Sequence, residues 1–247
     1  MKIDNFDIIR EHLTFEPAMK FDAETKKLKT LNDTYDRYIV HIIKRAKDSG
    51  GKAHGANTSN RLIKTYEVNS LEYFDKKRAH IVDLCESNGA RAYILPQVRS
   101  TYDCLKDMIK LAIDNLENPT IKFQHILRSA TCSMHKSRDK RWIIDLDNDE
   151  MDGWTVDEVV SLIKDNLVSC GKNPDDMYIV PTRNGTHIVT TPFNVQDANK
   201  KCRMMFEGVK KFPYEVDGRL GEVETHYRER TGWLHKDGMT LLYANID

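Results

Sequence analysis

The chain has 247 residues, which is long enough for one large domain or two small ones with a sizeable buried core. Its 38 Lys and Arg residues balance 38 Asp and Glu residues, so the overall charge does not indicate a nucleic-acid partner. The five cysteines form no C-x-x-C pair, so we expect no structural zinc cluster. No apolar run approaches the ~20 residues of a membrane span, so we expect no membrane partner. No signal sequence is evident, so we expect a cytoplasmic protein.

The first elements are predicted from residue type and alternation. Residues 4–13 suit a short helix, and residues 14–33 are polar and irregular. Tyr, Ile and Val residues predict a strand over 35–43, and alternation predicts a second strand over 61–68. Between them, a Gly- and Ser-containing stretch at 49–60 has the composition of a loop, so the two strands form a hairpin.

Two helices and a third strand follow. Asn69 with Glu72 resembles a capping box and predicts a helix that runs to about residue 87. Asn88-Gly89 ends that helix, and residues 90–95 form the third strand. A stripe of apolar residues at helical spacing predicts a second helix over 100–116.

The second half begins with a strand over 141–147. Thr155 and Glu158 form a capping box for the next helix, and five apolar residues share one face of it: Val156, Val159, Val160, Ile163 and Leu167. Two strands, 177–181 and 186–191, form a hairpin. The strand over 141–147 is expected to be central and covered on one side by the helix from residue 155.

The rest of the chain completes an α+β order. A helix is predicted over 194–209, a strand near 214–216 and a terminal strand over 239–246. The order suits two α/β modules, 1–120 and 121–247, or one continuous domain, with a mixed or antiparallel sheet that carries the strand 141–147.

Charge is unevenly distributed in the second half. Residues 122–144 contain six Lys or Arg and one acid, whereas residues 145–176 contain ten acids and two Lys. A basic face beside an acidic pocket suits a phosphate-rich ligand that carries metal ions. The alternative interpretation is that charged residues cluster by chance on a solvent-exposed surface.

Two carboxylates lie two residues apart on the strand Arg141-Trp-Ile-Ile-Asp-Leu-Asp147. Alternate residues of a strand point to the same face, so Asp145 and Asp147 project together while Leu146 turns into the core. Carboxylates that lie side by side repel, and a divalent cation between them relieves the repulsion. A strand end that runs into an acidic turn is the alternative, because Asn148-Asp149-Glu150 follow.

The hairpin after the helix carries a second group of polar residues. Asn184-Gly185 predicts its turn, Thr182 and Arg183 precede that turn, and His187 follows it. Turn amides, a hydroxyl, a guanidinium and an imidazole within six residues suit a triphosphate. A histidine that is merely packed or solvated is the alternative.

Together these segments resemble the archaeo-eukaryotic primase superfamily. The first motif of that family is an apolar strand that ends in D-x-D or D-x-E, and its second places a histidine after a small residue on a later strand. The nearest form is the polymerase domain of bacterial end-joining DNA ligases, in which a histidine and a basic stretch precede the D-L-D strand, as at Met134 to Asp139. The resemblance covers residues 132–194 by motif and the rest by layout, and a phage-type member would fit.

The resemblance implies roles for individual residues. Asp145 and Asp147 would bind catalytic Mg²⁺ or Mn²⁺, and five further side chains would contact the phosphates of the nucleotide: Thr182, Arg183 and His187, helped by His135 and Arg138. The family has a third acidic residue on a later strand. Asp237 lies at a suitable distance and is the first candidate, ahead of Asp217 and Asp247.

The resulting expectation is a metal-dependent nucleotidyltransferase that uses nucleoside triphosphates and a DNA or RNA template. The alternative is a non-catalytic nucleotide- or nucleic-acid-binding accessory protein on the same scaffold, which the zero net charge and the poorly fitting third acid favour.

A haloacid-dehalogenase-type phosphatase also begins with an apolar strand and D-x-D. That class places a glycine and then Thr or Val after the second Asp, where this chain has Asn148-Asp149. The triplet Lys236-Asp-Gly238 lacks one residue of the ligase motif K-x-D-G.

Overall fold

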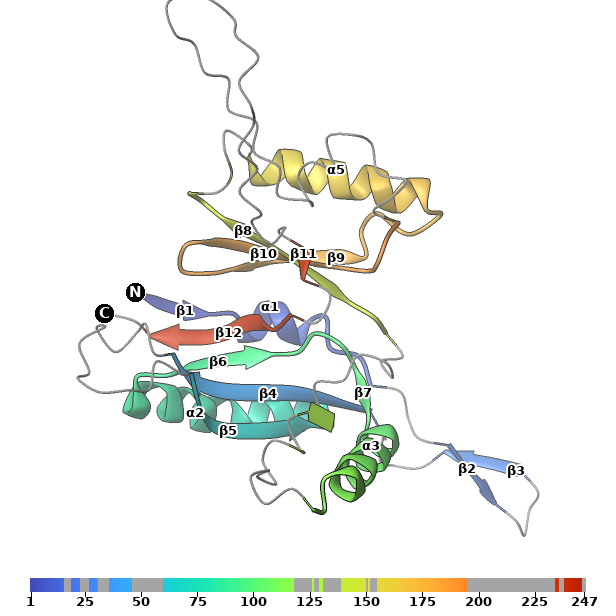
Figure 1. Ribbon diagram of the computed structural model, residues 1–247. Coiled ribbons are helices and arrows are strands. Elements are labelled where there is room, and N and C mark those ends of the chain that lie inside the picture. The colour runs from blue at the N-terminus through green and yellow to red at the C-terminus, as the bar shows by residue number, and fades with distance from the viewer. Residues whose placement is uncertain are drawn as a thin grey trace, which may run out of the picture.

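The computed structural model describes residues 1–15, 19–22, 27–30, 36–45, 60–117, 126, 129–130, 139–149, 151, 155–194, 234–235 and 238–245. Within these residues the architecture is α+β, with helices packed on antiparallel sheets (Figure 1). This is the fold class that the sequence predicts. None of the helices in the described part of the chain is long and apolar enough to cross a membrane.

A six-stranded sheet, called here the first sheet, contains both ends of the described chain. Its strand order is β1 (Lys2–Asp4), β12 (Thr240–Asn245), β6 (Arg91–Ile94), β4 (Asp36–Lys44) and β5 (Arg61–Val68), and β7 (Arg99–Ser100) pairs with β4. All these pairings are antiparallel. The structure thus confirms the predicted hairpin, the third strand and the terminal strand. The sequence does not predict β1, because three residues with one buried side chain carry too little pattern.

The helix α2 (Leu71–Asn88) covers one face of the first sheet (Figure 1). Its N-cap is Ser70, whose hydroxyl accepts a hydrogen bond from the backbone N–H of Tyr73 at 3.1 Å. The predicted cap at Asn69 is therefore wrong by one residue. Gly89 ends the helix in the left-handed conformation, with φ of +56°, which glycine adopts without steric cost.

A four-stranded antiparallel sheet, the second sheet, has the order β11 (Leu234–His235), β8 (Trp142–Asp147), β10 (Gly185–Thr190) and β9 (Met177–Pro181). The strand β8 therefore has a neighbour on each side, as expected of a central strand. The helix α5 (Val156–Ser169) lies over this sheet (Figure 1), and both hydrogen bonds of the Thr155–Glu158 capping box are present. Val159, Ile163 and Leu167 are fully buried in one cluster with Ile144 and Leu146, as predicted.

Three other elements differ from expectation or add to it. The short helix α1 spans Phe6–Arg10, inside the predicted range. The stretch predicted to be irregular contains an antiparallel pair, β2 (Met19–Asp22) and β3 (Lys27–Thr30). Cross-strand pairing thus orders a polar segment whose residue types do not favour strands.

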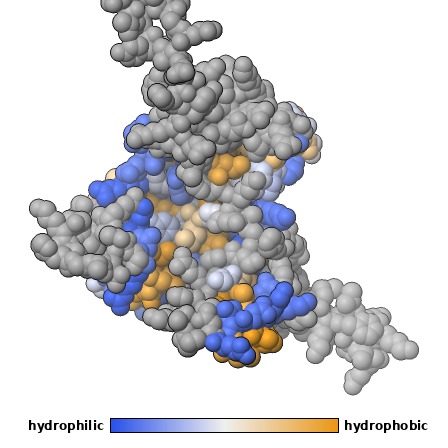
Figure 2. All heavy atoms as spheres, viewed as in Figure 1, coloured by the Kyte–Doolittle hydropathy of each residue, from blue (hydrophilic) through white to orange (hydrophobic). Residues whose placement is uncertain are grey.

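The helix α3 (Thr101–Asp114) confirms the second predicted helix. Its apolar stripe, however, faces outward among the described residues, with Leu105, Ile109 and Ile113 each about half exposed or more. Figure 2 shows hydrophobic and hydrophilic residues side by side at the lower end of the visible face, where Figure 1 places α3. Apolar residues at helical spacing therefore predict the helix correctly, but they do not show whether its apolar face packs against the rest of the protein.

The two sheets share contacts that fix their relative position. Ile143, Val180 and Val189 of the second sheet belong to the same buried cluster as the first sheet and α2. The side-chain amide of Asn5, itself buried, donates hydrogen bonds to the carbonyl oxygens of Pro181 and Leu241, each at 2.9 Å. One amide thus joins the end of β9 to β12.

The predicted division near residue 120 separates the strands of the two sheets with one exception. The strand β12 lies at the end of the second predicted module but pairs with β1 and β6 of the first sheet. The predicted strand at 214–216 lies outside the described residues, as do the helix at 194–209 beyond Asn194 and the loop at 49–60 apart from Asn60.

Candidate functional site

The two faces of β8 serve different purposes. Ile144 and Leu146 are buried beneath α5. Asp145 and Asp147 alternate with them and line a pocket on the opposite face. The side-chain period of two along a strand therefore places both carboxylates together, and the core holds the strand that carries them.

The register between β8 and β10 brings the histidine to the first carboxylate. His187 pairs with Asp145 across the ladder, and its Nε2 lies 3.2 Å from Asp145 Oδ1. Its Nδ1 lies 3.1 Å from the hydroxyl oxygen of Thr240, a fully buried residue of β12. The imidazole is thus held from both sides and bridges the two sheets. If the ring is neutral, Nε2–H donates to Asp145 and the Thr240 hydroxyl donates to Nδ1.

Gly185 allows this close pairing. A Cβ atom at this position would lie 1.9 Å from the carbonyl oxygen of Leu146, so any side chain would push β8 and β10 apart. The backbone N–H of Thr182 donates to the carbonyl of Gly185 at 3.0 Å, which leaves Arg183 and Asn184 as the central turn residues. The predicted hairpin is confirmed, but its turn lies one residue earlier than Asn184-Gly185. Gly185 instead allows β8 and β10 to lie close together.

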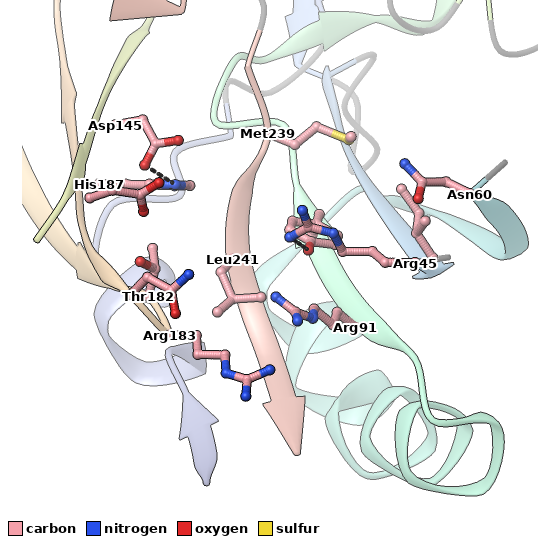
Figure 3. A pocket seen from close by; sticks show the side chains of 13 residues that line it. Arg45, Asn60, Arg91, Asp145, Thr182, Arg183, His187, Met239 and Leu241 are labelled. Carbon is pink, nitrogen blue, oxygen red and sulfur yellow. Dashed lines mark hydrogen bonds and ion pairs between the residues drawn. The ribbon is translucent and has the colours of Figure 1, made fainter. Parts of the chain in front are cut away.

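A pocket of about 320 Å³ lies between the two sheets. The second sheet contributes all five predicted site residues that the structure describes: Asp145, Asp147, Thr182, Arg183 and His187. Figure 3 shows Asp145 and His187 on one side of the cavity, with Thr182 and Arg183 nearby at the hairpin. Residues that the sequence separates by about forty positions thus meet in one cavity.

The opposite wall comes from the first sheet and is not predicted from the sequence. Ile43, Arg45, Arg91, Tyr93 and Leu241 line it, together with Asn60 and Met239. The Arg45 guanidinium donates from Nη1 to the Tyr93 hydroxyl at 3.4 Å. These residues carry no motif, because their positions on separate strands become neighbours only through the sheet order β12-β6-β4.

Some predicted site residues cannot be placed. His135, Arg138 and Asp237 lie outside the described residues, as do Asp217 and Asp247. Arg141, the last arginine of the basic segment 122–144, does not line the pocket. Its guanidinium binds Asp139 at 3.0 Å and Asp176 at 2.5 Å, so it stabilises the start of β8.

The donors in the pocket fit a hard divalent cation. Asp145 and Asp147 offer carboxylate oxygens from one strand face, and Mg²⁺ commonly binds one or two carboxylates and takes its other ligands from water and substrate phosphates. No group of three or more His, Cys, Asp or Glu side chains in the described ranges converges as a complete metal site. Two carboxylates on one strand face match the part of such a Mg²⁺ site that the protein supplies.

Comparison with known proteins gives no match to any family model, curated protein or solved structure.

Proposed function

We propose that the protein is a metal-dependent nucleotidyltransferase that acts on nucleic acid in the manner of a DNA primase or polymerase and uses nucleoside triphosphates. The primase-polymerase fold, a DNA or RNA template and a cytoplasmic location belong to the same proposal. The observation that carries it is the meeting of Asp145, Asp147, Thr182, Arg183 and His187 in one pocket. Carboxylates for a cation and donors for phosphates are the two sets of groups that phosphoryl transfer requires.

The residues have distinct roles in this proposal. Asp145 and Asp147 would hold Mg²⁺ or Mn²⁺, which neutralises charge on the phosphates and on the attacking and leaving oxygens when bound. Arg183 and Thr182 present a guanidinium and a hydroxyl at the mouth of the hairpin. His187 lies between Asp145 and Thr240, so it can donate to a phosphate if the cation draws the Asp145 carboxylate away.

A second candidate is a nucleotide- or nucleic-acid-binding accessory protein without catalysis. The contact between His187 Nε2 and Asp145 Oδ1 favours it, because a carboxylate that already binds an imidazole must exchange that partner for the metal. The two candidates also differ in the third acidic residue, which the nucleotidyltransferase requires and the accessory protein does not. Replacement of Asp237 tests whether this residue has that role.

The test is extension of a primed template with Mn²⁺ and all nucleoside triphosphates, alongside direct measurement of nucleotide binding. Asp147→Ala should abolish turnover while nucleotide still binds weakly. His187→Ala should mainly weaken nucleotide affinity, by about 1.5–3 kcal/mol for a charge-assisted hydrogen bond. Asp149→Ala, an exposed acid in the turn after β8, serves as the control and should leave both readouts unchanged.

Binding without extension in the wild type would support the accessory protein. No nucleotide binding at all, with His187→Ala indistinguishable from the wild type, would refute the nucleotidyltransferase and a nucleotide-binding accessory protein. Loss of extension in Asp237→Asn with nucleotide affinity retained would assign the third acidic role to that residue.

A further inference from the structure

Three arginine side chains converge on the pocket from distant segments. Arg45 directly follows β4, Arg91 begins β6, and Arg183 lies in the turn between β9 and β10. Figure 3 shows the guanidinium groups of Arg91 and Arg183 directed toward each other from opposite sides of Leu241. Like charges that gather in one recess repel one another, and a bound anion relieves that repulsion.

Three arginines outside the pocket are paired with carboxylates. Arg10 binds Asp75, Arg78 binds Asp4 and Asp7, and Arg141 binds Asp139 and Asp176. Each of these three guanidinium groups therefore has a carboxylate partner within the protein.

Two of the pocket arginines, Arg45 and Arg183, contrast with these pairs. Neither Arg45 nor Arg183 forms an ion pair with a described residue, although Asp145 and Asp147 line the same cavity. The one described hydrogen bond of the Arg45 guanidinium goes to the neutral Tyr93 hydroxyl, which orients the group without cancelling its charge. The pocket thus keeps positive charge available on both walls.

We propose that Arg45, Arg91 and Arg183 together form a binding site for a polyphosphate, namely the tail of the nucleoside triphosphate. This deepens the proposed function and rests on the nucleotide occupying this pocket. Planar guanidinium groups bind phosphate oxygens through paired, charge-assisted hydrogen bonds. A cation on the carboxylates and the three arginines would then share the charge of the tail.

A terminal polyphosphate fits better than the backbone of a nucleic-acid strand. Arg91 is only 6% exposed, so the phosphate that it binds must enter the cavity. A polyphosphate concentrates several charges on adjacent phosphorus atoms, whereas successive phosphates of a strand are separated by sugars. Three guanidinium groups around one cavity of about 320 Å³ match the compact distribution of charge.

The experiment is calorimetric titration of the full chain with inorganic triphosphate in the absence of divalent metal. Arg45→Gln and Arg183→Gln should each weaken binding about tenfold or more, as expected for a lost charge-assisted contact. Arg61→Gln is the matched control, because Arg61 is exposed on the adjacent strand β5, does not line the pocket and carries the same charge. Arg91→Gln is included only if its melting temperature equals that of the wild type, since Arg91 is buried.

A second titration uses an oligothymidylate without terminal phosphates, so that only phosphodiesters are present. Affinity for triphosphate that falls in both pocket variants, with little change for the oligonucleotide, supports the polyphosphate site. A loss confined to the oligonucleotide would assign the arginines to the strand and overturn the proposal. Equal triphosphate affinity in all variants and the control would also overturn it.

These readouts are separate from the test of the proposed function. Arginine-dependent triphosphate binding in a protein that never extends a primer would retain this site and refute the nucleotidyltransferase. Extension that Arg45→Gln and Arg183→Gln leave unchanged would retain the nucleotidyltransferase and refute this site.

Discussion

The two walls of the pocket differ in how the chain builds them. The wall on the second sheet comes from one continuous region, in which β8 and the β9–β10 hairpin supply the carboxylates and His187. The wall on the first sheet takes Arg45, Arg91 and Leu241 from three strands, two near the start of the chain and one at its end. One wall is therefore encoded locally, and the other exists only after the first sheet has assembled.

The walls also differ in their support. The face of the second sheet behind the carboxylates packs on α5 in a buried cluster of its own. The first sheet packs on α1 and α2 in a larger cluster that also takes in three side chains of the second sheet. Substitutions in each buried cluster, and at the contact between the two sheets, should therefore show how much each contributes to stability.

The largest effect is expected from the core behind the carboxylates. Ile163→Ala should destabilise the fold by about 2–5 kcal/mol, because a fully buried side chain in the cluster beneath β8 is lost. Val168→Ala on the same helix is the control and should change stability by no more than about 0.5 kcal/mol, since Val168 is 58% exposed. Chemical denaturation measures both, and equal effects of the two changes would show that α5 does not support this wall.

The next largest effect on stability is expected at Asn5, which joins the two sheets. Asn5→Ala removes two buried hydrogen bonds, to Pro181 and Leu241, and should cost about 1–3 kcal/mol. Asn5 makes no side-chain hydrogen bond as the N-cap of α1, so the loss reports on the contact between the walls. Asn5→Asp keeps the shape but removes the donor, so it should be at least as destabilising. A fully stable Asn5→Asp protein would contradict this role.

The smallest effect concerns the contact that holds His187. Thr240→Val removes the hydroxyl beside Nδ1 with little change in volume and should weaken nucleotide affinity about two- to tenfold, or about 0.5–1.5 kcal/mol. The control is Thr65→Val, which removes the same contact from His41 Nδ1, a histidine that does not line the pocket. Equal nucleotide affinity in the two variants would show that Thr240 does not position His187.

Much of the fold could be predicted because its signals are local. The capping box at Thr155 and the apolar face that ends at Leu167 identify α5, and the alternation at Ile144 to Asp147 assigns both faces of β8. The exact cap of α2 and the centre of the β9–β10 turn were each wrong by one residue. Neighbouring polar residues such as Asn69 and Ser70 have nearly equal capping preference, so packing decides between them.

The rest depends on contacts between segments that are distant in the sequence. The hairpin of β2 and β3 and the outward stripe of α3 follow from tertiary surroundings, not from residue types. The same holds for Arg45 and Arg91, which are ordinary strand-end arginines until the sheet order brings them to the carboxylates. Asn5 gave no signal either, since its partners are the carbonyl oxygens of Pro181 and Leu241.

The most direct test of the central claim is calorimetric titration of Mn²⁺ into three proteins in the presence of a non-hydrolysable nucleoside triphosphate. These are the wild type, Asp147→Asn and the control Asp149→Asn, which removes the same charge two residues away in an exposed turn. A paired carboxylate site predicts that Asp147→Asn weakens Mn²⁺ binding at least about tenfold, while Asp149→Asn binds as the wild type does. Equal Mn²⁺ binding by all three proteins, or none by the wild type, would contradict a metal-dependent nucleotide site in this pocket.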